Sequence, residues 1–474
     1  MTGKILKYFG CAIAIFLLIV SCAPFKPQVR STPNGLMAAG YSLYGEWEKM
    51  PDRWWESLVV PELNALIEEA LSDNLELRET WARLRQARAS AVQAGAGLYP
   101  DLSLGGEGTA RRQKSDQGTS DTESYQLGLA SSYELDLWGR VRSERQAALL
   151  AEKASREDYH TAAMTLAAEV ANRYVEIISQ RRQKQLLEEQ LKANRIYLEL
   201  VELRFFNSMV SALDVYQQKQ IVEKAAAEIP LVEQQEQLLR HELAVLLGKP
   251  PQAVAAIEAE NFPTVGVLPD LGLPADLLAK RPDVRAAGLR LQGADWQVAA
   301  ARADRLPAIR LSGQGAFAST AVSALFDHWF LQLAGSLSGP IFDGGKKVAE
   351  VERTRAVAEE RLAAYRLRVL TAIKEVEDAL VSEQKQKENI TLVRERIATA
   401  RKALEQATDR YRKGINDYLP VLTQLISVQD LEQNLIQKEA SLLKSRISLY
   451  RALGGSWMEE LKPADISYNE RTNQ

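Results

Sequence analysis

Two long stretches without glycine or proline constrain this chain more than any other feature. One runs from Lys346 to Lys413 and the other from Arg140 to Ile229. An α-helix rises about 1.5 Å per residue, so the first stretch would extend about 100 Å as a single helix. Helices of globular proteins average only about 11–12 residues. The chain is therefore expected to contain helices longer than a compact soluble domain is wide.

The first residues have the pattern of an export signal. Lys4 and Lys7 precede an uncharged apolar core from Cys11 to Val20. At about 10 residues this core is too short to span a bilayer, and it is typical of a signal peptide. We therefore expect a signal peptide over residues 1–21.

The end of that core resembles a bacterial lipoprotein box, with the residues Ile19-Val20-Ser21-Cys22. The resemblance implies cleavage before Cys22 and a covalent lipid on that cysteine, and no other cofactor is expected. A plain signal peptide with an incidental cysteine is the alternative. Ala23, where an aspartate could stand, implies export to the outer membrane of a Gram-negative cell. Residues 22–50 contain Pro24, Pro27 and Pro33 and are expected to form an extended, lipidated linker.

Composition excludes several classes of protein. Lys and Arg number 59 against 62 Asp and Glu, so the chain does not resemble a polybasic nucleic-acid binder. Cys11 would leave with the signal peptide, so Cys22 would have no partner for an intramolecular disulfide. No later stretch approaches about 18 uninterrupted apolar residues, so no membrane-spanning helix is expected.

Alternation with a period of two indicates strands between the helices. After an apolar helical pattern that stops near Ala94, strands are expected at about 100–112 and 124–137. From Tyr125 to Leu137 one face is apolar and the other is small or polar, with Ser131 as the exception. This length and pattern match a membrane strand, although a half-buried strand of a soluble sheet is the alternative.

The first long stretch is expected to be a helical hairpin. Its pattern weakens around 205–214, where we place a tight turn between two helices. Pro230 should kink or interrupt the second helix, and Gly248 should end it.

The sequence then repeats itself at a nearly constant offset. Pro100 matches Pro307 at 207 positions, and Gly139 matches Gly345 at 206 positions. We therefore expect repeat 1 over residues 51–250, a connection over 251–272, repeat 2 over 273–457 and a C-terminal tail over 458–474. Repeat 2 should contain strands at about 307–317 and 328–340, followed by its own long helical hairpin.

Four strands cannot close a barrel alone. An open sheet edge is excluded from lipid, because each unpaired N–H or C=O group costs several kcal/mol. The strands must therefore belong to a soluble sheet or close by oligomerisation. The apolar residues of the long helices are also too dispersed for an isolated two-helix hairpin, and they would suit a cylinder of helices from several subunits.

Six stretches of the chain form a pattern that is highly specific when they are taken together. They are Tyr133-Glu134-Leu135-Asp136-Leu137-Trp138-Gly139-Arg140, Leu278-Ala279-Lys280-Arg281-Pro282-Asp283-Val284, Gly339-Pro340-Ile341-Phe342-Asp343-Gly344-Gly345, Glu375-Val376-Glu377-Asp378-Ala379-Leu380, Gly414-Ile415-Asn416-Asp417-Tyr418-Leu419 and Ala452-Leu453-Gly454-Gly455-Ser456-Trp457. These stretches resemble the TolC-like outer-membrane factor family of tripartite efflux systems, specifically its lipoprotein branch of NodT/OprM-like proteins. One departure is Ser208, which stands where a glycine equivalent to Gly414 would be usual.

The resemblance implies a mainly α protein with a membrane β-barrel portion. Each protomer of a homotrimer would give four strands to a twelve-stranded barrel in the outer membrane. Its helices would form a hollow α-helical barrel in the periplasm, with the lipid anchor on the periplasmic side. The implied function is a passive exit duct, opened at its periplasmic tip by an adaptor protein and an inner-membrane pump of the RND type.

The resemblance places the gate and the adaptor-docking region at the two helix-to-helix turns, 205–214 and 412–420. The candidate residues are Asp417, Asn416 and Tyr418 in the second turn, and Asp214 and Ser211 in the first. For Asp214 and Asp417 the alternative is a helix N-cap, which contributes about 1 kcal/mol through one backbone hydrogen bond.

The strand-to-helix corners are a second candidate region. Trp138 and Phe342 could lie at the membrane interface, where aromatic residues are enriched, or pack beneath the corners. The accompanying corner residues are Gly139, Gly344 and Gly345. His160, His241 and His328 lack the spacing of metal ligands, so no metal is expected. Glu375, Glu377 and Asp378 are expected on a solvated or duct-lining face.

Two other kinds of function compete with the efflux duct. A periplasmic coiled-coil structural or adaptor lipoprotein would also have a helical hairpin, but it would not have four alternating strands in duplicated order. A type I secretion duct would share the whole architecture. An enzyme has no supporting constellation of residues, and the exported substrate cannot be read from the sequence.

Overall fold

The computed structural model describes residues 25–27, 40–42, 47–48, 51–116, 118–253 and 257–461. The expected signal peptide, Cys22 and most of the linker lie outside these residues, as does most of the tail. Among the described residues, no helix has an apolar stretch long enough to cross a membrane.

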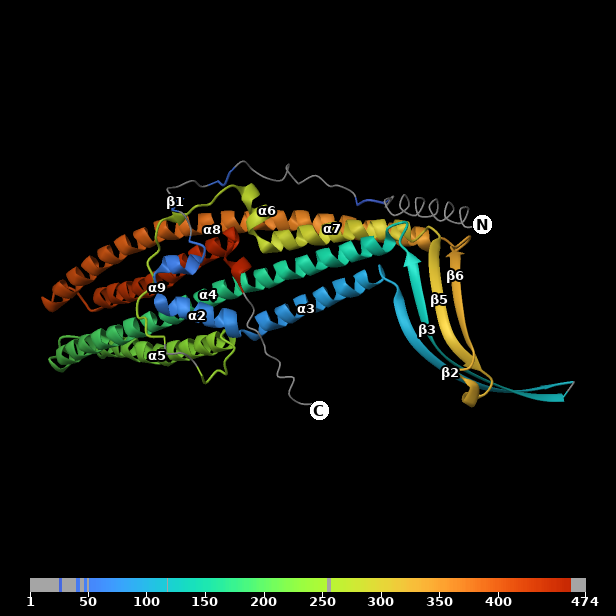
Figure 1. Ribbon diagram of the computed structural model, residues 1–474. Coiled ribbons are helices and arrows are strands. Elements are labelled where there is room, and N and C mark those ends of the chain that lie inside the picture. Colours follow the sequence, from blue (N-terminus) through green and yellow to red (C-terminus); the bar gives the residue numbers. More distant parts are fainter. Residues whose placement is uncertain are drawn as a thin grey trace. The chain divides into compact units, whose positions relative to one another are not determined.

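The helices and strands follow the order expected from the internal repeat (Figure 1). Repeat 1 contains α2 (Pro61–Asp73), α3 (Leu75–Ala96), β2 (Asp101–Ser115), β3 (Gly118–Leu135), α4 (Arg140–Phe206) and α5 (Ala212–Leu246). Repeat 2 contains α6 (Leu277–Lys280), α7 (Pro282–Ala303), β5 (Ala308–Ser319), β6 (Trp329–Ser338), α8 (Lys346–Arg412) and α9 (Leu419–Leu453). The short elements are β1 (Trp47–Glu48), β4 (Leu268–Pro269), η2 (Trp54–Leu58), η3 (Pro274–Asp276), η4 (Val322–Ala324) and η5 (Trp457–Glu460).

The long helices are continuous, and the two repeats match in length. Helices α4 and α8 each have 67 residues, and α5 and α9 each have 35. Of the two effects expected of Pro230, a kink or an interruption, the interruption is wrong, because α5 runs through this residue. Pro230 is exposed, so water can bond the backbone carbonyl that this proline leaves without an N–H partner.

The first helical pattern is two helices rather than one. Asn74 separates α2 from α3, and its side chain accepts a 2.8 Å hydrogen bond from the N–H of Leu77. Its amide also donates to the carbonyl of Leu246, at 2.9 Å. The sequence pattern missed this break because the apolar spacing continues across it.

The chain divides into two compact units, and one of them carries the sheet. This unit comprises the described residues within 82–157 and 285–368. Its sheet has the antiparallel order β2-β3-β5-β6, which places β2 and β6 at the two edges (Figure 1). Strand β3 begins at Gly118 rather than near 124, because the polar tip of the hairpin continues the ladder to the pair Ser115–Gly118.

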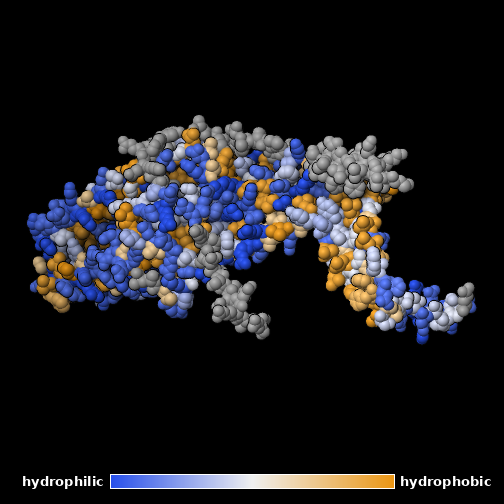
Figure 2. Space-filling view, in the orientation of Figure 1, coloured by the Kyte–Doolittle hydropathy of each residue, from blue (hydrophilic) through white to orange (hydrophobic). Residues whose placement is uncertain are grey.

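Hydrophobic residues gather over the sheet, and hydrophilic residues cover the far end of the β2–β3 hairpin (Figure 2). Every described residue of β2 and β6 is exposed. Leu333, for example, is 79% exposed and Leu104 is 74% exposed. This monomer therefore presents apolar side chains along two strands that have only one neighbour each.

The other unit, residues 35–81, 158–284 and 369–474, contains the main apolar core. Trp54 stacks on Tyr450 with ring centroids 5.3 Å apart, and Trp55 meets Trp457 edge-on at 4.8 Å. Residues of α2, α4, α5 and α9 pack around these rings. Burying such aromatic side chains is the largest single source of stability that a core of this kind offers.

Candidate functional site

The two helix-to-helix turns have the same backbone structure. In the second, the N–H of Gly414 bonds the carbonyl of Tyr411 at 3.0 Å and that of Ile415 bonds the carbonyl of Arg410 at 2.9 Å. In the first, the N–H groups of Ser208 and Met209 make the equivalent bonds at 2.8 and 2.9 Å. This pairing is the Schellman motif, which needs a left-handed residue.

Ser208 takes that left-handed position although it is not a glycine. Its φ is 58°, against 71° for Gly414. A left-handed residue with a Cβ costs about 1–2 kcal/mol. The departure seen in the sequence therefore leaves the shape of the first turn unchanged and adds strain to it.

The two turns differ in how the following helix begins. Ser211 is the N-cap of α5 and forms a capping box with Asp214: the N–H of Asp214 donates to the Ser211 hydroxyl, and the Asp214 carboxylate accepts from the N–H of Ser211 at 3.0 Å. Ser211 is therefore the N-cap, and Asp214 is the third residue of α5 and its capping-box partner rather than the N-cap that the sequence allowed for.

Asp417 does not have that role. It is the repeat equivalent of Ser211, but the residue three positions on is Pro420, which has no N–H to donate. Helix α9 begins at Leu419. Its N-cap residue is Tyr418, whose side chain makes no capping hydrogen bond. The N-cap alternative for Asp417 is wrong. Within the described part of the chain its exposed carboxylate has no hydrogen-bond or ion-pair partner.

Tyr418 and Asn416, the neighbours of Asp417, contact the protein rather than solvent. The Tyr418 ring is 1% exposed, and its hydroxyl donates a 2.7 Å hydrogen bond to Oε1 of Gln218 in α5. Burial raises the pKa of the Tyr418 hydroxyl, so the group stays a neutral donor at physiological pH. The side-chain oxygen of Asn416 accepts from Nε of Arg410 at 3.3 Å.

Further amide hydrogen bonds adjoin this contact, both within the first hairpin and between the two hairpins. Gln218 donates to the backbone carbonyl of Asn194 at 2.8 Å, and Gln429 donates to the Asn194 side chain at 2.7 Å. Gln433 donates to Gln190 at 3.1 Å. Sequence reasoning missed these residues because a lone amide on a helix has no pattern of its own.

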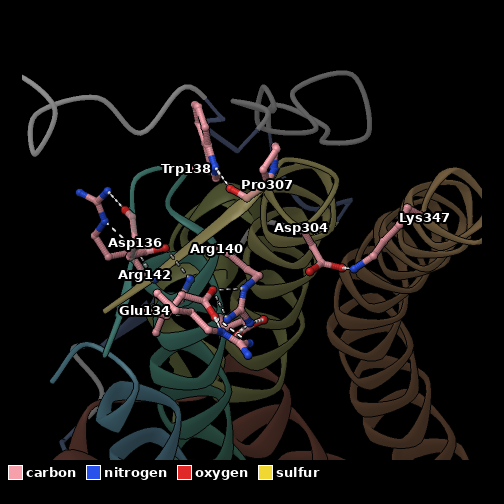
Figure 3. Close-up of polar contacts among 11 residues, drawn as sticks. Glu134, Asp136, Trp138, Arg140, Arg142, Asp304, Pro307 and Lys347 are labelled. Carbon is pink, nitrogen blue, oxygen red and sulfur yellow. Dashed lines mark hydrogen bonds and ion pairs between the residues drawn. The ribbon is translucent and has the colours of Figure 1, made fainter. Parts of the chain in front are cut away.

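At the strand-to-helix corner of repeat 1, most of the polar side chains are paired (Figure 3). The carboxylate of Asp136 accepts from the N–H groups of Val141 and Arg142, both at 2.9 Å, and so caps α4. The indole of Trp138 donates to the carbonyl of Pro307 at 2.7 Å. Arg140 and Arg310 both bond the carboxylate of Glu134, at 2.7 and 3.2 Å.

The corner of repeat 2 is built with fewer side-chain contacts. Asp343 caps α8 by accepting from the N–H groups of Gly345 and Lys347, both at 2.9 Å. The hydrogen bond from the N–H of Lys347 is the main reason that the pKa of Asp343 lies below its usual range. Phe342 is 91% exposed and does not pack beneath the corner, whereas Trp138 is half-buried.

The corner glycines supply backbone conformations that other residues resist. Gly139, Gly344 and Gly345 have φ of 77°, 64° and 85°. Asp136 and Asp343 are 207 positions apart, whereas Gly139 and Gly345 are 206 apart. The two aspartates therefore do not share the offset of the glycines, although both cap the helix that follows.

Buried ion pairs in the helical unit are a further feature that the sequence did not reveal. Arg446 of α9 and Glu383 of α8 are 1% and 2% exposed, and Nε of Arg446 lies 2.8 Å from the Glu383 carboxylate. Arg281 bonds both Asp283 and Glu375 at 2.8 Å. Glu375, expected on a solvated or duct-lining face, is 29% exposed and also neutralises the buried guanidinium of Arg281. Glu377 accepts from the N–H of Ser42 at 2.9 Å.

The three histidines give no sign of a metal centre. His160 is buried beside Tyr159, with ring centroids 6.1 Å apart. Across the described ranges, no three His, Cys, Asp or Glu side chains lie close enough to hold a metal ion.

Comparison with known proteins identifies the family. The family described as "outer membrane efflux protein" matches the chain twice, over residues 66–249 and 273–455. The chain is 32% identical to the pyoverdine export outer membrane protein OpmQ of Pseudomonas putida, over 95% of this chain and 98% of that protein. It is 33% identical to outer membrane protein OprJ of Pseudomonas aeruginosa, over 85% and 86%.

Solved structures agree with the sequence comparison. The structure of the outer-membrane channel OprN superposes with a TM-score of 0.86 at 27% identity, over 92% of this chain and 100% of that one. The resemblance to TolC-like channels is therefore confirmed, and the alternative of a periplasmic adaptor is not supported. The chain belongs to the outer membrane efflux protein family, a family of channels rather than enzymes, and is an outer-membrane exit duct for efflux.

Proposed function

We propose that three copies of this chain form one duct, with four strands from each closing a twelve-stranded barrel in the outer membrane. The observation that carries this proposal is the four-stranded sheet with β2 and β6 as its edges. An unpaired edge in lipid costs several kcal/mol for each N–H or C=O group, so a single copy cannot remain open there. Pairing the edges of neighbouring copies removes that cost.

We propose further that Asp417 acts at the gate of this duct. Its carboxylate is exposed and unpaired within the described part of the chain, whereas Asp214 is engaged in a capping box. Three copies around one axis would bring three negative charges together. Their repulsion would favour either binding of a cation between them or separation of the helices. Tyr418, Asn416, Ser211 and Asp214 would then shape the turns without lining the gate themselves.

Conductance of single channels in planar bilayers tests the role of Asp417. The variants Asp417→Asn and Asp417→Ala should change the conductance of the resting channel, with an increase expected for Ala. Asp430→Asn is the matched control, because Asp430 is another exposed and unpaired carboxylate in the described part of this hairpin, on α9. If Asp417 variants and the control conduct equally, the gate does not depend on this residue.

The expected partners are a periplasmic adaptor and an inner-membrane pump of the RND type. Relatives named as outer membrane proteins of solvent and toluene efflux pumps support efflux rather than type I secretion. The names also include pyoverdine export, so the relatives do not share one substrate. If this duct serves one pump, cells that lack both the duct and the pump should be no more sensitive to the exported compounds than cells that lack either one. An additive effect of the two deletions would count against the pairing.

The lipid anchor is the remaining part of the proposal. Cys22 lies outside the described residues, and the lipoprotein-box pattern is its support. The anchor would hold the chain to the periplasmic side of the outer membrane. Cys22→Ser should abolish incorporation of labelled palmitate, and labelling that persists in this variant would show the assignment to be wrong.

A further inference from the structure

The internal repeat provides an example, within one chain, of how the end of one repeat pairs with the start of the next. Within the chain, β3 of repeat 1 pairs with β5 of repeat 2 in a defined antiparallel register that includes Leu127–Phe317 and Ala130–Gln314. In a ring of identical chains, β6 of one copy stands in the same relation to β2 of the next. The contact inside one chain is therefore a template for the contact between chains.

The two hairpins fix how the repeats correspond. Pro100 and Pro307 precede β2 and β5, which sets that pair of strands 207 positions apart. Asp101 pairs with Ser132 in the first hairpin, and its equivalent Ala308 pairs with Ser338 in the second. Residues of β3 therefore correspond to residues of β6 that lie 206 positions later.

Applying both offsets converts the internal pairs into pairs between copies. The internal pair Ala130–Gln314 becomes Ser336 with Glu107 of the next copy. The same shift turns Leu127–Phe317 into Leu333 with Ala110, and Ser132–Ser312 into Ser338 with Gly105. We propose that β6 of one copy pairs with β2 of the next in this register, from Ser338–Gly105 to Trp329–Lys114.

The two faces of the sheet are consistent with this register. Leu333 and Leu337 would lie opposite Ala110 and Gly106, on the face that carries Leu127 and Leu129 in β3. Ser336 and Gln332 would lie opposite Glu107 and Arg111 on the polar face. A slip of one residue would turn the leucines toward that polar face, so only slips of two residues keep the faces matched.

The pairing between copies would lack two side-chain contacts that the β3–β5 pairing inside the chain has. Arg310, which bonds Glu134 across the internal seam, corresponds to Ser103. Trp138, which bonds the carbonyl of Pro307, is replaced by glycine at the corner of repeat 2. The seam between copies therefore depends on the backbone ladder, which makes its register the property that specifies assembly.

Disulfide trapping in outer membranes tests the register. The variant Ser336→Cys with Glu107→Cys places two thiols directly opposite each other, at a Cα separation of about 4.5–5.5 Å. Disulfides form at Cα separations of about 4.4–6.8 Å. Oxidation should convert most of the protein from the one-chain band to two-chain and three-chain bands on a denaturing gel, and reduction should reverse this.

Two offset variants keep the faces but shift the register. Ser336→Cys with Gly105→Cys, and Ser336→Cys with Thr109→Cys, place the thiols on diagonal positions, where the separation is about 7–8 Å. Neither should cross-link. The single variants control for Cys22, which the intact chain also contains.

This inference rests on the proposed trimer, but the two fail differently. Cross-linking in an offset variant, or no cross-linking in any pair of a protein that is trimeric by mass, would overturn the register and leave the trimer standing. A one-chain species in the membrane before oxidation would overturn the trimer itself.

Discussion

The hydroxyl of Tyr418 donates a 2.7 Å hydrogen bond to Oε1 of Gln218, and both side chains are buried. Tyr418 is the N-cap residue of α9, and Gln218 lies within α5, which begins at Ala212. Gln218 in turn donates to the carbonyl of Asn194 in α4. One tyrosine thus links the two turns of a single chain, and it is adjacent to the unpaired carboxylate of Asp417.

Removing that hydroxyl should loosen the contact between the hairpins. Tyr418→Phe leaves Oε1 of Gln218 buried without its donor, which costs about 1–3 kcal/mol. Hydrogen exchange followed by mass spectrometry should show faster exchange in peptides around 404–426. Tyr216→Phe is the matched control, because Tyr216 is 69% exposed. Equal protection in both variants would mean that the hydrogen bond does not hold the hairpins together.

The two turns should respond in opposite ways to changes at their left-handed residues. Gly414→Ala adds a Cβ that meets no atom within 4 Å, so its cost is only the strain of a positive φ, about 1–2 kcal/mol. Ser208→Gly removes the same strain from the first turn. Trypsin can cut after Arg412 and Lys413, and a cost of that size should speed local cleavage about 5–30-fold.

The cleavage result has a built-in comparison between the two turns. Cleavage near Arg204 should slow in Ser208→Gly, while cleavage near Arg412 stays unchanged in that variant. Faster cleavage of the first turn in Ser208→Gly would show that Ser208 is not strained there.

Low pH should lower the stability of the unit that contains α9, because it protonates Glu383. Burial alone would raise the pKa of this carboxyl, but its hydrogen bonds and charge pairs with Arg446 and Lys387 outweigh burial and lower the pKa. A carboxyl whose pKa is lower in the folded state stabilises the fold above its unfolded pKa, about 4.3. That stability is lost as the pH falls through the folded pKa. Thermal melting of the detergent-solubilised protein should therefore shift to lower temperature below about pH 4.

The variant Glu383→Gln separates this effect from general acid unfolding. It leaves the guanidinium of Arg446 buried and unpaired, which costs about 3–5 kcal/mol. It should also remove part of the acid-dependent shift. Glu388→Gln on the same helix is the control, because its partner Lys385 is exposed and surface pairs of this kind contribute little to stability. Identical melting curves for the two variants would contradict a stabilising role for the buried pair.

The indole of Trp138 should stabilise the corner of repeat 1. Trp138→Phe keeps an aromatic ring but removes the donor to the Pro307 carbonyl, a hydrogen bond that contributes about 0.5–1.5 kcal/mol. Phe342→Leu is the comparison at the other corner, where Phe342 is almost fully exposed. The temperature at which the barrel loses its compact gel mobility should fall for Trp138→Phe and stay unchanged for Phe342→Leu. The reverse order would contradict the assignment.

The sequence alone predicted the order of the long helices and strands because periodicity and the absence of glycine and proline are local properties. Helix α8 was expected from Lys346 to Lys413 and runs from Lys346 to Arg412. The break at Asn74 was missed, because it depends on a hydrogen bond to Leu246, which is far away in the sequence.

The candidate site was predicted less completely. The turns lie where they were expected, but the roles of their residues depend on neighbours that one sequence does not reveal. Pro420, three positions after Asp417, is visible in the sequence. Its missing N–H argues against an N-cap role for Asp417, since it removes the donor that Ser211 finds in Asp214. The partners of Tyr418 and Glu375 become apparent only when distant helices are packed together.

The mass of the protein extracted from outer membranes in mild detergent tests the central claim most directly. Native mass spectrometry should give three chains per particle, recovered with the outer-membrane fraction. That result is expected because the edges of β2 and β6 need partners in lipid. Recovery of a single chain from the soluble fraction would contradict the account.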